Sequence, residues 1–210
     1  MVGMTASTAE SRRAPHLGPE RRRPQVLDAA LSIAVEEGIA AVSIGRIAER
    51  LGVTRPVVYA CFADRVELIR ALVEREEHVI IEGTLAALVP REVDAPEAVF
   101  VSGFRALLSI VAQHPDAWRF IFDRAPDPAV AEFFGRGRAV VAAEFGRLLK
   151  PTLKAWGTVD PARKLPVLVE HFMSVCEGAV RSLLHEGSAW SPDDLGELVG
   201  KATYRAMRHA

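Results

Sequence analysis

The stretch of residues 44–63 constrains the fold of this chain more than any other part of the sequence. Its apolar positions have the spacing of two short helices that cross at a tight turn. Gly52 permits that turn, and Ala48 is small enough for the second helix to cross closely. The apolar residues expected to fix the angle between the two helices are Ile47, Leu51, Val53 and Val58. The stretch therefore predicts a helix-turn-helix whose short second helix projects outward.

Helix start signals recur along the rest of the chain, and no sustained alternation of polar and apolar residues predicts a sheet. Prolines follow capping side chains at Asp127, Asp160 and Ser191, as expected at the first position of a helix. Capping boxes are expected at residues 64–67 and 94–97. The expected helices lie near 21–37, 44–51, 55–61, from 66 onward, 95–113, 116–123, 128–156, 161–186 and 192–208. The prediction is an all-α fold, with an N-terminal three-helix helix-turn-helix domain followed by a larger helical bundle.

The net charge of −1 hides an uneven distribution along the chain. Residues 1–65 carry nine Lys+Arg against seven Asp+Glu, and residues 66–210 carry 17 against 20. We expect a flexible basic arm over 1–19, a helix-turn-helix domain over 20–66 and a helical domain over 67–210. Arg21, Arg22 and Arg23 adjoin a helix start and are expected to contact phosphates, whereas Arg12 and Arg13 fit a phosphate contact and a solvated tail equally well.

Several classes of protein are disfavoured by the sequence. No apolar run approaches the length of a membrane span, and the first residues lack a secretory pattern, so a cytoplasmic protein is expected. Cys61 and Cys176 lie too far apart in sequence to predict a zinc finger or a disulfide framework. His171, Cys176 and Glu177 lack the spacing of a metal or nucleophile site, and the glycines near residue 135 lack the pattern of a dinucleotide loop. No metal, cofactor or catalytic residue is expected.

Residues 21–72 resemble the DNA-binding domain of the TetR family of bacterial transcriptional regulators. The resemblance joins a preceding helix, the turn, an aromatic at Tyr59, Phe62 and a charged residue that opens the fourth helix. Pro56 stands where glycine is frequent in the family, and Cys61 replaces a common histidine. The DNA-contacting residues expected from the recognition helix and the resemblance together are Ser43, Thr54, Arg55, Val57, Tyr59 and Arg65. For Tyr59, packing against Phe62 and the first helix is the alternative.

The larger domain is predicted to bind a ligand and to dimerise. Its aromatic residues fit either a cavity or a plain hydrophobic core. The ligand-binding residues expected there are Phe104, Trp118, Phe122, Phe134, Phe172 and Cys176. The helices near 161–186 and 192–208 carry wide apolar faces that fit a four-helix interface between two subunits, or an ordinary intrachain core.

These features predict a homodimeric repressor that binds a palindromic operator in double-stranded DNA and leaves it when a small, largely apolar ligand binds. One alternative is a DNA-binding regulator controlled by a protein partner or by oxidation of Cys61, without a small-molecule ligand. The other is a helical enzyme that retains the fold and uses His171 or Glu177, for which the sequence offers no supporting motif.

Overall fold

The computed structural model describes residues 18–89, 96–122 and 128–210, with the side chains of 128–134 excluded. The predicted arm, with Arg12 and Arg13, therefore lies outside the described residues except for its last two positions. The side chain of Phe134, a predicted ligand contact, also lies outside them.

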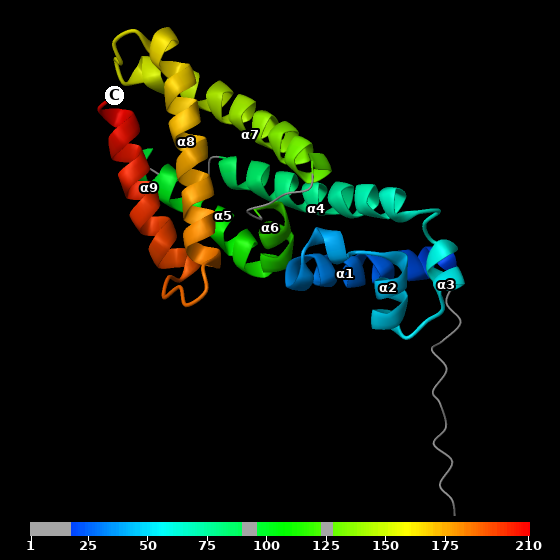
Figure 1. The fold of residues 1–210 in the computed structure, drawn as a ribbon. Helices are drawn as coiled ribbons and strands as arrows, with labels where there is room; N and C mark the ends of the chain where they lie inside the picture. Colours follow the sequence, from blue (N-terminus) through cyan, green and yellow to red (C-terminus); the bar gives the residue numbers. More distant parts are fainter. Residues whose placement is uncertain (1–17, 90–95, 123–127) are drawn as a thin grey trace, which may run out of the picture.

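The all-α prediction is confirmed, because the described residues form helices and connecting turns without a strand (Figure 1). The elements are α1 (Pro19–Glu37), the short 3-10 helix η1 (Ile39–Ala41), α2 (Ile44–Leu51), α3 (Arg55–Tyr59), α4 (Arg65–Leu88), α5 (Pro96–Gln113), α6 (Pro115–Ile121), α7 (Pro128–Ala155), α8 (Pro161–Leu184) and α9 (Pro192–Arg208). Most of the expected helix bounds agree with these within two residues.

The first three helices and the start of α4 enclose an N-terminal core. Val26, Ile33 and Ile47 are fully buried in it, and the core extends along α4 as far as Val73. Phe120 and Ile121 belong to the same core although they come from α6, much later in the sequence. The domain boundary predicted after residue 66 stays a prediction. The first turns of α4 pack with the N-terminal core.

A second core lies between α4 and the helices that follow it. Phe104 and Phe172 pack together there, and Phe172 also stacks on Phe145 with ring centroids 3.6 Å apart. Helix α9 runs along α5 at very short range, because Gly196 and Gly200 face the α5 backbone. A Cβ built on Gly200 would lie 2.5 Å from the Cα of Val101. Only glycine fits this crossing.

Of the caps predicted at Asp64, Asp160 and Ser191, two are confirmed. The side chain of Ser191 accepts a hydrogen bond from the Asp194 amide, and that of Asp64 accepts one from the Glu67 amide. The expected cap at Asp160 is wrong: this residue has φ 51°, in the left-handed region, and its carboxylate makes no capping bond. The conformation of the preceding turn therefore overrides its capping tendency.

Candidate nucleic-acid interface

The turn between α2 and α3 has the geometry that a helix-turn-helix requires. Gly52 adopts φ 63° and ψ 32°, a left-handed conformation that is costly for other residues. The amide of Val53 then donates to the carbonyl of Ala48 at 2.9 Å, which closes the turn. Ile47 and Val58 are fully buried beneath it, and Ala48 is buried at the crossing. The wedge of apolar residues thus fixes α3 against α2, as predicted.

Helix α3 presents most of its polar side chains to solvent. Thr54 and Arg55 are exposed, Tyr59 is 53% exposed, and Val57 is half-buried. Thr54 stands at the N-cap, yet its hydroxyl makes no capping hydrogen bond. Arg55 makes no hydrogen bond or ion pair with any side chain or backbone group that the structure describes. The four residues predicted on this helix therefore share one short element, with their polar groups available to a partner.

Gly45 is a residue of this surface that the sequence reasoning missed. A Cβ built on it would lie 3.2 Å from Nη2 of Arg55, so the guanidinium of α3 rests against the first turn of α2. A larger residue would push Arg55 away from this position. The signal was present, because a glycine early in a helix lowers helix stability and usually has a packing reason.

Ser43 and Arg65 hold the start of α2 in place. The Ser43 hydroxyl accepts a hydrogen bond from the Arg46 amide at 3.2 Å and so caps the helix. Arg65, the first residue of α4, donates from Nε to the carbonyl of Val42 at 2.7 Å and from Nη2 to that of Ile39 at 2.9 Å. The DNA contact predicted for Arg65 stays a prediction, and the observed geometry gives it a positioning role.

The arginines at the start of α1 have structural partners that the sequence did not indicate. Arg22 is buried. Arg23 donates to the carbonyl of Cys61 at 2.7 Å, and its guanidinium lies 4.1 Å from the ring centre of Phe62. Arg23 therefore packs against the segment that joins α3 to α4, and the phosphate contacts predicted for the cluster stay a prediction. Arg21 is exposed and keeps its predicted role.

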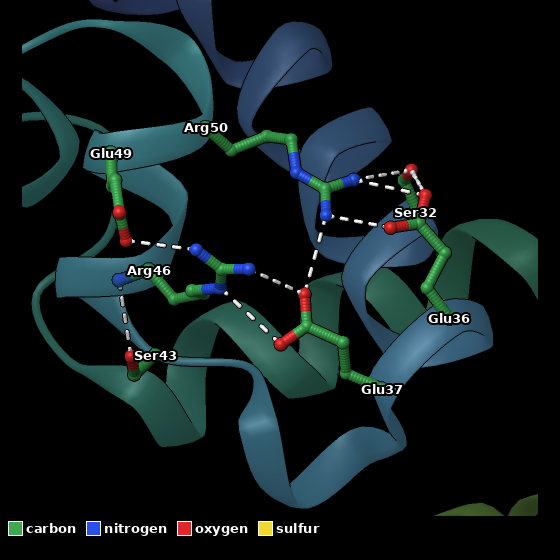
Figure 2. A network of polar contacts seen from close by, with 7 residues as sticks. All are labelled: Ser32, Glu36, Glu37, Ser43, Arg46, Glu49 and Arg50. Atoms are coloured by element: carbon green, nitrogen blue, oxygen red, sulfur yellow. Dashed lines mark hydrogen bonds and ion pairs between the residues drawn. The ribbon is translucent and has the colours of Figure 1, made fainter.

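Two arginines of α2 are neutralised by glutamates of α1 and α2, as Figure 2 shows. Arg46 pairs with Glu37 at 2.8 Å and with Glu49 at 2.9 Å. Arg50 pairs with Glu36 at 2.7 Å and also reaches Glu37. This α1–α2 ion-pair network braces the first helix of the motif against α1. It also neutralises two positive charges, whereas Arg55 of α3 has no partner among the residues that the structure describes.

Comparison with known proteins agrees with this geometry. The sequence model described as "Bacterial regulatory proteins, tetR family" matches residues 26–72, which span the helix-turn-helix and its supporting helices. Residues 26–72 are thus a TetR-family domain.

The chain is similar to two curated regulators. It is 30% identical over 123 residues to the HTH-type transcriptional activator FasR of Mycolicibacterium smegmatis, covering 58% of this chain and 55% of FasR. It is 34% identical over 59 residues to the HTH-type transcriptional regulator SrpR of Pseudomonas putida, covering 28% of each. The chain thus spans about half, or less, of the curated relatives it matches.

A solved structure extends the likeness of fold to nearly the whole chain. The TetR-like transcriptional regulator from Rhodococcus sp. RHA1 superposes with a TM-score of 0.63 at 20% identity, covering 92% of this chain and 98% of that one. At this identity the comparison supports the TetR-family fold alone.

The ion-pair network of this TetR-family domain predicts a dependence of stability on pH. Hydrogen bonds from Arg50, and then Ser32, lower the pKa of Glu36 from 4.5 to about 2. A carboxyl group whose pKa is lower in the folded than in the unfolded state stabilises the fold at a pH above the pKa of the unfolded state. This stabilisation is lost as the pH falls through the pKa of the folded state. We expect Arg50→Gln to lower Tm above pH 4.5, and the difference from the unmodified chain to shrink as pH falls towards about 2.

Thermal unfolding followed by circular dichroism at several pH values measures this difference. Arg70→Gln, on the exposed side of α4, is the matched control and should show no such trend. Because the network is exposed, added salt should weaken the effect as well. A Tm difference for Arg50→Gln that stays constant over the acidic range would contradict the assigned role of Glu36.

Two adjoining cavities lie in the helical domain, and most of the predicted ligand residues line them. The large cavity has a volume of about 470 Å³ and is bordered by Phe104, Phe172 and Cys176. The small cavity has a volume of about 80 Å³ and is bordered by Trp118, Phe122 and again Cys176. The residues thus lie around two spaces instead of one. Ligand binding by them stays a prediction.

The apolar face predicted for dimerisation on α8 packs mainly within its own chain. Phe172, Cys176 and Val180 are buried in the second core. These residues pack against α5 and α7, which fits the intrachain alternative, and dimerisation through α8 and α9 stays a prediction. Different residues are open to a partner: Val167 on α8 is 69% exposed and Leu198 on α9 is 52% exposed.

The geometry gives little support to control by oxidation of Cys61 or to an enzyme that uses His171. Burial raises the pKa of the Cys61 thiol, which disfavours the reactive thiolate. His171 is exposed while Cys176 is buried, so they do not form one site. Within the described ranges, no three His, Cys, Asp or Glu side chains are grouped to hold a metal. None of the described helices is long and apolar enough for a membrane span.

Proposed function

We propose that this protein is a homodimeric transcriptional repressor that binds an operator through α3 and leaves it when an apolar ligand enters the helical domain. The proposal is carried by three exposed side chains on a rigidly held α3 and its N-cap that have no partner among the described residues: Arg55, Thr54 and Tyr59. Such a helix fits the major groove, where arginine and threonine can reach base edges. The neighbouring helix start at Ser43 approaches a phosphate.

A dimer is needed because one short recognition helix reads too few base pairs for selectivity. We place the dimer interface on the outer faces of α8 and α9. Val167, Ser174 and Gly178 share a face of α8, and Leu198 and Ala202 share a face of α9, by helical spacing. The small side chains on these faces, together with the exposed apolar Val167 and Leu198, would let α8 and α9 of two subunits pack closely around a twofold axis.

Leu198→Glu is expected to weaken dimerisation at least about tenfold, because a charge would be buried at the centre of an apolar contact. Sedimentation velocity over a range of concentrations measures the effect. Val159→Glu changes an exposed valine between α7 and α8, outside the proposed face, and serves as control. A Leu198→Glu chain that dimerises like the unmodified protein would place the interface elsewhere.

Helix α6 supports a route from the cavities to the DNA-binding domain. Trp118 of α6 borders the small cavity, and Phe120 lies in the N-terminal core. Ile121 belongs to both. A ligand that displaces α6 therefore also displaces α1 and, with it, α3. A hundredfold ligand preference for the DNA-incompetent arrangement corresponds to about 2.7 kcal/mol of coupling.

The proposal of repression, as opposed to activation, rests on the release step. A bound dimer blocks the DNA that it covers, and ligand binding then frees it. FasR is named an activator, but the alignment covers only 55% of FasR, so activation is not inferred for this chain. In vitro transcription from a promoter that the protein binds should fall when the unmodified protein is added. It should stay high when the Arg55→Ala variant, which still dimerises, is added instead.

Selection of genomic DNA tests the proposed function. Fragments from the source genome are passed over the purified protein at near-physiological salt, and the retained DNA is sequenced. We expect a few sites that share an inverted repeat, and their loss with Arg55→Ala. Uniform retention across the genome, or retention unchanged by Arg55→Ala, would overturn the proposal.

A further inference from the structure

Three residues border both cavities, and we call them the neck. These are Thr84 of α4, Leu107 of α5 and Cys176 of α8. The large cavity continues between α4, α5, α7 and α8, and the small one between α4, α6, α7 and α8. A single elongated molecule could therefore occupy the large cavity and reach past Cys176 into the small one.

The two cavities differ in what they touch. No residue that borders the large cavity belongs to α1, α2, α3 or α6. One wall of the small cavity consists of Trp118 and Ile121 of α6 and its C-cap residue Phe122, and Ile121 also belongs to the N-terminal core. Filling the large cavity alone leaves the contact of α6 with the DNA-binding domain intact, whereas a group in the small cavity presses on it.

The lining of the large cavity favours an uncharged ligand. None of the described residues that border it is an Asp, Glu, His, Lys or Arg. Its two hydroxyls already donate within their own helices, Thr84 to the carbonyl of Ile80 at 2.7 Å and Thr152 to that of Leu148 at 3.2 Å. A buried charge without a partner is costly, so the described lining favours a ligand whose buried part is uncharged. A hydrocarbon chain needs no such partner.

The small cavity can receive the end of that chain. Arg138, on its border, is already paired with Glu170 and Glu177. The indole Nε1 of Trp118 is buried and has no hydrogen-bond partner among the residues that the structure describes. A neutral oxygen on the ligand would satisfy this donor, which is otherwise left unpaired.

We propose that ligand length decides the response: short uncharged hydrocarbon ligands occupy the large cavity silently, and longer ones pass the neck, reach α6 and release DNA. This inference rests on the proposed function for its DNA readout. Its structural part, the order in which the two cavities fill, stands on the neck residues alone.

Two native tryptophans report on the two cavities separately. Trp156 borders the large cavity and Trp118 the small one. In a Trp190→Phe background, each is kept as the sole tryptophan by changing the other to phenylalanine. The probes are the straight-chain primary alcohols octanol, dodecanol and hexadecanol, with dodecanoate and dodecylammonium as charged counterparts. Fluorescence is recorded without DNA, and release is recorded by anisotropy of a labelled retained fragment with the unmodified chain.

We expect short alcohols to change Trp156 fluorescence alone, and only those that also change Trp118 fluorescence to release DNA. Cys176→Phe should narrow the neck, keep the Trp156 response and require about tenfold or more alcohol for half-release. Cys176→Ala, which leaves the neck open, is the matched control. Thr84→Phe narrows the neck from α4 and repeats the test if Cys176→Phe does not fold.

The inference would be overturned if an alcohol that changes only Trp156 fluorescence released DNA. Equal binding of dodecanoate and dodecanol would also overturn it, as would the absence of any fluorescence response to the alcohols. A chain that retains no DNA fails the proposed function before any alcohol is added. The two tryptophan responses still decide the order of filling in that case, so the two failures are distinguishable.

Discussion

Replacing Arg55 or Tyr59 by alanine is expected to weaken operator binding severely while the fold and the dimer remain intact. A lost contact to a base edge costs about 1–3 kcal/mol, and a twofold dimer loses it in both half-sites, so the total is about 2–6 kcal/mol. Both side chains are exposed, and Arg55 has no partner to lose among the described residues. The effect on stability should therefore be small.

Fluorescence anisotropy with a labelled operator fragment, at fixed salt, measures the two affinities. Arg163→Ala removes an exposed arginine at the start of α8, far from α3 in the sequence, and is the matched control for lost charge. Circular dichroism and sedimentation confirm that each variant folds and dimerises. If Arg55→Ala and Tyr59→Ala both bind like the unmodified chain, the assignment of α3 as the recognition helix is wrong.

Replacing Gly200 by alanine is expected to destabilise the helical domain by about 1–3 kcal/mol, which corresponds to a fall in Tm of several degrees. The new Cβ would lie 2.5 Å from the Cα of Val101, and backbone atoms cannot give way as a flexible side chain does. The helices α5 and α9 would have to separate, and apolar contacts along their length would be lost.

Gly135→Ala provides the matched control for Gly200→Ala. Gly135 also lies inside a helix, but a Cβ there meets no atom within 4 Å, so the substitution should raise stability by about 0.5–1 kcal/mol through helix propensity. Thermal or urea unfolding measures both changes. Equal stabilisation by the two substitutions would show that α5 and α9 do not approach as closely as described.

Local signals made the helix-turn-helix predictable. The left-handed turn at Gly52 and the wedge at Ile47 and Val58 involve residues within a few positions of one another, so their spacing is visible in the sequence. Helix starts at prolines were predictable for the same reason. At Asp160 the same signal misled, because the conformation of the turn, and not the residue type, decides whether a cap forms.

Long-range packing was not predictable from the sequence. Arg65 binds carbonyls more than twenty residues earlier in the chain, and Arg23 binds one 38 residues later. Their charges indicated phosphate contacts equally well. On α8, periodicity identified an apolar face around Phe172 but could not tell whether it covers a neighbouring helix or a second subunit. Likewise, aromatic content could not distinguish a filled core from a cavity divided at Cys176.

The central claim is that two copies of α3 read a symmetric DNA site. Nuclease protection of a retained genomic fragment tests it most directly. The account predicts two protected half-sites in inverted orientation, with centres one helical turn of DNA or a multiple of it apart, and no protection by Arg55→Ala. A single asymmetric protected segment, or the same protection by Arg55→Ala, would contradict it.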